Sequence, residues 1–199
     1  MIKDIKDQLL ESAAIKKQLA DNYTEIIADA ARRCIEALNN GGKIMFCGNG
    51  GSAADSQHLA TELVVRLARE IEKRPALPSI ALTTDTSILT ACANDIGFNL
   101  IFARQIEALG RSADILIAIS TSGKSPNILE AVKAARDKQI YTIGLTGKNG
   151  GNLADTTIAV PSEDAQRIQE SHIAIGHIII GLIEREIIKH GYTGEAQRS

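Results

Sequence analysis

Hydrophobic and polar residues follow two different periods along this chain, and each period predicts a different kind of element. Apolar residues recur every three or four positions over 4–20 and 23–39, so two helices are expected there, the second ending before Gly41 and Gly42. Short continuous runs of aliphatic residues are typical of strands buried on both faces. Five such runs occur: KIMFC (43–47), SIALT (79–83), DILIAIS (114–120), YTIGLT (141–146) and TTIAVP (156–161).

The helical period returns between these runs. It begins near Ser52, whose hydroxyl can cap a helix, and it ends at RPALP (74–78). Further helices are predicted over TSILTACAND (86–95), FNLIFARQIEALG (98–110), SPNILEAVKAARDKQ (125–139) and 166–191, after which YTGEAQRS (192–199) should fray. Strands that alternate with helices predict a five-stranded parallel sheet flanked by helices. No linker or repeat divides 1–199, so we expect a single α/β domain with N-terminal helices and a long C-terminal helix.

Composition narrows the class of partner. The 199 residues are 44% hydrophobic, 3% aromatic and 23% charged, which indicates a large aliphatic core and argues against disorder. A formal net charge of −2 gives no electrostatic basis for nucleic acid or an anionic membrane as the main partner. The expected partner is therefore a small molecule.

Three further features favour a cytoplasmic protein. Cys34, Cys47 and Cys92 lie in apolar segments at spacings unlike a zinc ribbon or a redox pair, so free buried thiols are expected. The first 19 residues mix acids and bases with periodic apolar residues, as an amphipathic helix does and a signal peptide does not. The apolar window from Ile173 is interrupted by His177 and two glutamates, so a buried helix is expected rather than a membrane span.

Ligands of parallel sheets bind beyond the carboxyl ends of the strands, and two polar loops are predicted there. The loop STSGKSPN (120–127) enters a helix with four hydroxyls, those of Ser120, Thr121, Ser122 and Ser125. Helix N-termini bind anions, so a phosphate group is the expected ligand of this loop. Ordinary capping would need only one hydroxyl. Lys124 in the same loop is either a phosphate contact or, as we favour, a solvated charge.

The loop GNGGSA (48–53) is a weaker signal, because it has neither the dinucleotide spacing nor a Gly-Lys-Ser/Thr ending. Its glycines still let the backbone approach a ligand closely. In the helix that follows, His58 and Glu62 are four residues apart and share one face. They could be two metal ligands, a base with its orienting partner, or a structural pair. The closing helix adds Gln169, His172 and His177, and the isoleucines around His177 suggest that this imidazole is buried.

Taken together, these segments resemble the sugar isomerase (SIS) family, in particular its bacterial branch that isomerises phosphorylated heptoses. The resemblance rests on GNGGSAADSQHLATEL, ALTTDTSILTACANDIGFN, STSGKSPN, LTGKNGG and RIQESHIAIGHI, which occur in this order over nearly the whole chain. It implies a flavodoxin-like, three-layer fold. It also implies conversion of sedoheptulose 7-phosphate to D-glycero-D-manno-heptose 7-phosphate, the first step towards nucleotide-activated heptose for lipopolysaccharide or other surface glycans.

The resemblance also implies roles for individual residues. Glu62 and His177 match the acid/base pair, and His58, Glu62, Gln169 and His177 match the ligands of one Zn²⁺ per subunit. The substrate contacts match Asn49, Gly50, Gly51, Glu62, Asn94, Asp95, Ser120, Thr121, Ser122, Ser125 and Gln169. The family members are homotetramers with active sites between subunits, so residues 1–40 are expected to serve oligomerisation.

One spacing bears on that assembly. Gln169 and His177 are eight residues apart, about 12 Å along a regular helix, so one chain could hardly offer both to one tetrahedral ion. Either Gln169 precedes the regular helix, or neighbouring subunits share the site. Two alternatives to an enzyme stay open: a non-catalytic SIS protein that binds the replication initiator, and a SIS regulatory domain that senses a phosphosugar. A binder has no need of Glu62 and His177, and no DNA-binding segment accompanies the domain.

Overall fold

The computed structural model describes residues 1–67 and 74–194. Five parallel strands form one sheet in the order β2-β1-β3-β4-β5. They are β1 (Ile44–Gly48), β2 (Ser79–Ala81), β3 (Ile115–Ser120), β4 (Tyr141–Gly147) and β5 (Thr156–Val160). This is the flavodoxin-like arrangement expected from the sequence, with every strand run found where the aliphatic pattern predicts it.

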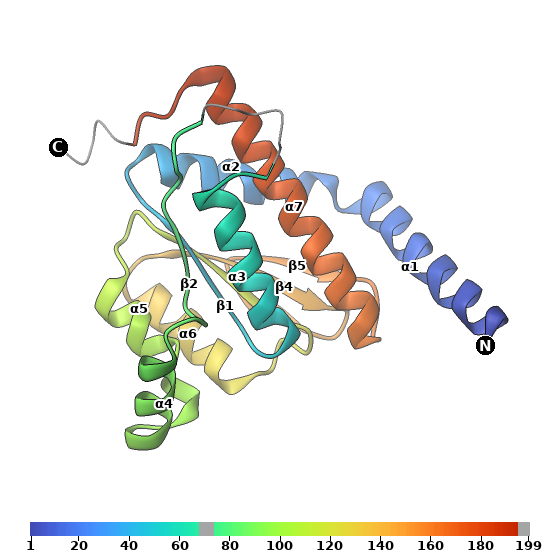
Figure 1. Cartoon of the computed structure of the whole chain (residues 1–199), viewed down its shortest axis with the longest axis horizontal. Coiled ribbons are helices and arrows are strands. Elements are labelled where there is room, and N and C mark those ends of the chain that lie inside the picture. The colour runs from blue at the N-terminus through green and yellow to red at the C-terminus, as the bar shows by residue number, and fades with distance from the viewer. Residues whose placement is uncertain (68–73, 195–199) are drawn as a thin grey trace.

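Seven α-helices and one short 3-10 turn surround the sheet within the described residues. Helices α2, α3 and α7 cover one face and α5 and α6 the other, while the N-terminal part of α1 extends away from the body (Figure 1). The bounds are α1 (Ile2–Asn22), α2 (Thr24–Asn39), α3 (Gly51–Val64), α4 (Thr86–Asp95), η1 (Phe98–Leu100), α5 (Ala103–Leu109), α6 (Pro126–Asp137) and α7 (Ala165–His190). No helix among the described residues is long and apolar enough to cross a membrane.

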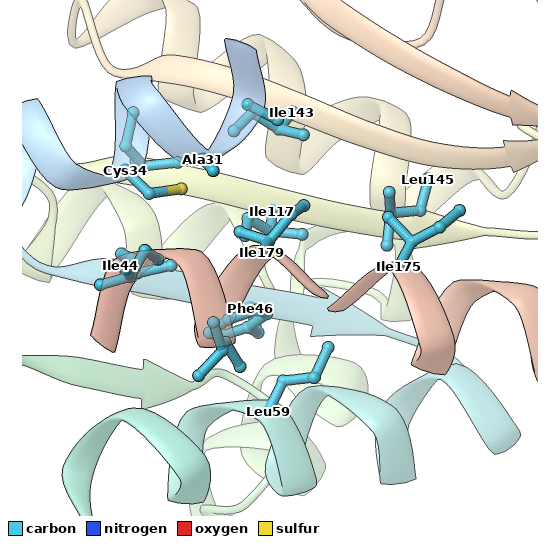
Figure 2. Packing of buried hydrophobic residues seen from close by; sticks show 14 of the residues in the cluster. Ala31, Cys34, Ile44, Phe46, Leu59, Ile117, Ile143, Leu145, Ile175 and Ile179 are labelled. Carbon is cyan, nitrogen blue, oxygen red and sulfur yellow. The ribbon is translucent and has the colours of Figure 1, made fainter. Parts of the chain in front are cut away.

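Alternate residues of the central strands fill two separate cores. On the α7 face, Ile44 and Phe46 of β1 and Ile117 of β3 pack with Ile175 and Ile179 of α7 (Figure 2). The intervening residues of the same strands pack against α5 and α6 on the other face. A strand buried on both faces must be apolar at every position, which is why the predicted runs are continuous rather than alternating.

Two of the predicted helices differ in extent from those in the structure, and one predicted cap is wrong. The helix expected over 98–110 is divided into η1 and α5, and Ile101, Phe102 and Ala103 at the division are all buried. The helix that begins at Gly51 has Gly50 rather than Ser52 at its N-cap, with no side-chain cap bond, and Ser52 is buried in its first turn.

That helix, α3, also ends earlier than expected, at Val64, with 65–67 outside it; the remainder of the predicted stretch, 68–73, lies outside the described residues. The tail differs as well. Thr193 donates to Asn39 through both its amide (3.5 Å) and its hydroxyl (3.3 Å), and Gly194 is buried. The part of YTGEAQRS that the structure describes is therefore held against α2 instead of fraying, whereas 195–199 lie outside the described residues.

The order of the strands fixes where a ligand can bind. The chain runs from β1 to β2 on one side and then crosses to β3 on the other side of β1, so the crevice beyond the carboxyl ends of β1 and β3 is the switch point of this sheet. The loop 49–50 follows β1 and the loop 121–125 follows β3. Both loops singled out in the sequence therefore meet at one edge.

Candidate active site

A reciprocal amide pair joins the two loops. Asn49 Nδ2 donates to Asn127 Oδ1 at 2.9 Å, and Asn127 Nδ2 donates back to Asn49 Oδ1 at 2.8 Å. Asn127 is buried at the first turn of α6, so the pair fixes the glycine loop against the serine loop. Sequence reasoning missed Asn127, although it ends the quoted loop; the signal was an amide in each of two loops that follow neighbouring strands.

The hydroxyls of the serine loop lie at the N-terminus of α6. Ser125 is the N-cap of α6, with Pro126 as the first helical residue, yet its side chain makes no capping bond. Its hydroxyl instead lies 3.2 Å from that of Ser120, and Ser122 Oγ accepts from the amide of Lys124 at 3.2 Å. Because the Ser125 hydroxyl is not used for capping, simple capping does not account for this cluster. The side chain of Lys124 is exposed.

Close backbone packing holds the turn of this loop. Gly123 has a φ of +64°, and a Cβ there would lie 2.1 Å from the carbonyl oxygen of Gly150. The amide of Gly147 donates to Thr121 O at 2.9 Å. The end of β4 and the loop after it, which together contain the LTGKNGG segment (145–151), thus support the serine loop, and only glycine fits at the contact.

The acid/base candidates converge from two helices that are far apart in sequence. His58 Nε2 of α3 lies 2.7 Å from His177 Nε2 of α7 and 3.5 Å from Glu62 Oε1, and the two imidazole rings meet edge to face with centroids 5.0 Å apart. The Glu62 side chain is 17% exposed and that of His58 is 46% exposed, so substrate could reach the cluster while the carboxylate is mostly shielded.

Burial and charge act together on these side chains. Burial lowers the pKa of His177 below its ordinary value, His58 lowers it further, and the Glu62 carboxylate opposes both. One turn before His58, Asp55 has a carboxylate oxygen that is buried and, among the described residues, has no hydrogen-bond partner. Burial raises the pKa of Asp55 and the nearby His58 lowers it. Sequence reasoning did not single out Asp55, since an aspartate near a helix start is usually a surface residue.

Three of the four expected metal ligands form a plausible ligand set. The ligand atoms of His58, Glu62 and His177 all lie within 4.8 Å of one another. Two imidazoles and a carboxylate suit Zn²⁺, and bonds of about 2.0–2.2 Å would place tetrahedral ligands about 3.3–3.6 Å apart. The His58–Glu62 separation of 3.5 Å matches that spacing, whereas the two imidazoles at 2.7 Å would have to part slightly.

Gln169, the fourth expected ligand, does not join this set within the chain. It lies inside the regular helix α7, so the idea that it precedes the helix is wrong. Its side chain packs against Gly51, where a Cβ would lie 2.9 Å from Gln169 Nε2. Gln169 therefore belongs to the glycine loop end of α3, two turns before His58.

Asn94 and Asp95 are also separate from the cluster. Both are exposed at the C-terminal end of α4, where Asn94 Nδ2 donates to Asp95 Oδ1 at 2.7 Å. Within the part of the chain that the structure describes, no hydrogen bond joins either residue to α3 or α7. Helix α4 packs instead on η1.

The buried histidine of α7 is His172, not His177. His172 is fully buried and its Nε2 lies 3.1 Å from Thr146 O, whereas His177 is partly exposed. The expectation that the isoleucines near His177 would bury it is wrong, because adjacent residues on a helix point in different directions. His172 lies instead in the stripe of buried residues Ile168, Ile175 and Ile179, three to seven positions away.

Comparisons with known proteins identify the class. Residues 9–147 match the model of the SIS domain family. The chain belongs to the SIS domain family. It is 50% identical over 185 residues to a phosphoheptose isomerase of Pelodictyon phaeoclathratiforme, covering 91% of this chain and 87% of the relative, and 51% identical over 187 residues to one of Nitratiruptor sp. (92% and 98%).

Among solved structures, the fold is similar to a phosphoheptose isomerase of Neisseria gonorrhoeae, with a TM-score of 0.84, 42% identity, and coverage of 92% of this chain and 98% of the other. It is also similar to a phosphoheptose isomerase of Francisella tularensis (TM-score 0.87, 40% identity, 92% and 98%). At these identities the similarity extends to sequence as well as fold.

Proposed function

We propose that the protein is a phosphoheptose isomerase, which converts sedoheptulose 7-phosphate to D-glycero-D-manno-heptose 7-phosphate. The observation that carries the proposal is the convergence of Glu62 and His177, which are 115 positions apart in the chain, in a fold whose serine loop lies at the carboxyl end of the neighbouring strand β3. Relatives whose sequences are about half identical to this one over nine tenths of the chain support the proposal.

The reaction needs a carboxylate and a second proton carrier. Glu62 removes a proton from C1 of the open-chain ketose, the C1–H electrons form the C1=C2 double bond, and the C2 carbonyl electrons move to its oxygen, which takes a proton. Glu62 then returns its proton to C2 of the resulting enediol. His177 supplies the proton that O2 takes up and accepts the proton that leaves O1, so that C1 becomes the aldehyde. No outside oxidant is required, because C1 is oxidised as C2 is reduced.

The loops hold the rest of the sugar. The backbone amides at the start of α6 and the hydroxyls of Ser120, Thr121, Ser122 and Ser125 would bind the 7-phosphate, which lies at the opposite end of the substrate from the reacting carbons. Asn49, Gly50 and Gly51 would contact the sugar hydroxyls. The Asn49–Asn127 pair keeps these two subsites at a fixed separation.

We further propose that His58, Glu62 and His177 hold a zinc ion. Bound there, zinc would polarise the carbonyl oxygen and hold the side chains in place. Gln169, eight residues before His177 on α7, would complete the ligands from a neighbouring subunit, and the exposed Asn94 and Asp95 would reach a substrate in the same way.

That arrangement requires an oligomer, which we propose to be a homotetramer. An apolar groove of about 390 Å³ lies between α1, α2 and α7, and Ile2, Ile5 and Leu9 of α1 are exposed. Exposed apolar surface of this kind is typical of subunit interfaces. Light scattering coupled to gel filtration tests the stoichiometry.

We also propose a cytoplasmic location and a role in activated heptose synthesis for surface glycans such as lipopolysaccharide.

The decisive experiment is conversion of sedoheptulose 7-phosphate by the purified protein, with and without zinc or a chelator. Glu62→Gln and His177→Gln should abolish turnover while the protein remains folded. His190→Gln is the matched control, since His190 lies exposed at the end of the same helix, paired with Glu186 at 3.4 Å. Absence of turnover by folded wild type supplied with zinc would refute the isomerase and favour the initiator-binding alternative.

A further inference from the structure

A buried ion pair ties the end of the helix that carries Glu62 to the helix that carries His177. Arg74 Nε donates to Glu184 Oε1 at 2.7 Å, and both side chains are 1% exposed. Arg74 lies in the segment before β2, and Glu184 lies on α7. Placing two charges in a protein interior is costly, so a pair kept there must bind other groups well to be tolerated.

The guanidinium of Arg74 binds the C-terminal end of α3. Its Nη1 donates to Leu63 O at 2.7 Å and its Nη2 to Glu62 O at 2.6 Å; Nη1 also reaches Pro75 O at 2.9 Å. The last carbonyls of a helix have no partner inside it and carry partial negative charge, so a cation there is stabilising. One of the two helix carbonyls that Arg74 binds belongs to Glu62 itself.

Glu184 also links α7 to the end of α3. Its Oε1 also accepts the amide of Leu67 at 2.9 Å, just beyond the end of α3. Glu184 is seven residues after His177, which is close to two full turns, so both side chains leave α7 on one face. That face meets α3: His177 contacts His58, and Glu184 holds the segment that ends the helix.

We propose that Arg74 and Glu184 are positioning residues for the acid/base pair, setting the location of the Glu62 end of α3 relative to His177 on α7. The proposal rests on the isomerase function above. Among the described residues, the hydrogen bonds given above for Arg74 and Glu184 join them to each other, to the end of α3 and to the segments beside it, and not to the loops that would bind the phosphate and the sugar hydroxyls. Misplacement of a catalytic group by about 1 Å can reduce a rate about a hundredfold. Loss of the pair should therefore lower kcat and leave KM nearly unchanged.

The test compares Arg74→Lys and Glu184→Gln with Asp114→Asn. The last is a matched control, because Asp114 is also a buried carboxylate paired with a cation, Lys43, but it lies at the amino ends of β1 and β3, away from the site. Lysine keeps the charge at position 74 but cannot span a carboxylate and two carbonyls as the planar guanidinium does.

We expect kcat to fall about ten- to a hundredfold in Arg74→Lys and Glu184→Gln, with KM within about threefold of wild type. In Asp114→Asn, kcat should stay near the wild-type value even though Tm falls by a similar amount. A wild-type kcat in Arg74→Lys would overturn the proposal. So would a fall of kcat in Asp114→Asn as large as that in the two test variants at a similar loss of Tm.

A second readout does not depend on turnover. In protein labelled with ¹⁵N-histidine, the imidazole signals of His58 and His177 should shift in Arg74→Lys and Glu184→Gln, while that of His190 should not. If wild type itself proves inactive, the isomerase proposal fails and these signals alone decide the positioning claim. Unchanged His58 and His177 signals would refute it.

Discussion

The buried histidine of α7 should make the fold sensitive to acid in a defined pH range. Burial lowers the pKa of His172 from its ordinary value of 6.5 to about 4, and its hydrogen bond with the Thr146 carbonyl only partly offsets this. The folded state therefore keeps this imidazole neutral after the unfolded chain has become protonated. Because the folded pKa lies below the unfolded one, stability is intact above pH 6.5 and falls as the pH drops towards 4.

The size of the effect follows from the two pKa values. A shift of about 2.5 units corresponds to about 3 kcal/mol when it is fully expressed, and about 2 kcal/mol of that is already lost at pH 5. That is a large share of the roughly 5–15 kcal/mol that stabilises a typical domain.

Urea unfolding at pH 7.5, 6, 5 and 4.5, at one fixed protein concentration, measures this loss in wild type and in His172→Gln. Glutamine does not titrate and can still donate to Thr146 O, so the variant should lose about 2 kcal/mol less than wild type between pH 7.5 and 5. His190→Gln, which alters an exposed imidazole, should follow wild type. If wild type and His172→Gln lose stability in parallel, the burial of a neutral His172 does not govern the acid sensitivity, and the reasoning is wrong.

Three further outcomes are expected. Asn127→Ala, which leaves the amide of its loop partner unpaired, should cost about 1–3 kcal/mol in urea unfolding and raise KM, because the two subsites lose their fixed separation; an unchanged KM would contradict this role. Gly51→Ala should leave Tm almost unchanged yet reduce turnover, since the new Cβ displaces only the flexible end of Gln169, which lies 2.9 Å away; full activity would show that Gln169 is not needed there. Cys34 and Cys47 have their pKa raised to about 12 by burial, so a thiol reagent at pH 8 should label them, as read by mass spectrometry, only once urea unfolds the protein.

Much of the fold could be read from local pattern because each element is encoded by its own neighbours. The five aliphatic runs became five strands, and the polar loops after the first and third met at the switch point, because parallel order places carboxyl ends together. The pairing of His58 with Glu62 also followed from a spacing of four on one helix.

Local pattern failed where the outcome depended on a second element. The stretch 98–110 has a helical period, yet it is divided into η1 and α5 at Ile101 and Phe102, which lie in the core that also contains residues of α6. Helix α3 ends at Val64, and the guanidinium of Arg74, which lies outside the helix, donates hydrogen bonds to carbonyls of its last turn. Nothing in the residues around Glu62 encodes that partner, which lies 12 positions away and is oriented by α7.

The sequence by itself determined which residue types are present and in what order: the strands, the helices, the two loops, and the polar residues expected of an aldose–ketose isomerase site. Only the tertiary structure decided which of them meet. It packed α3 against α7, so that His58 and His177, 119 positions apart, touch, while it buried His172 and left Gln169 beside Gly51. The physical reason is that the direction of a helical side chain is set by the face that packs, and the packed face depends on apolar surface contributed by distant segments.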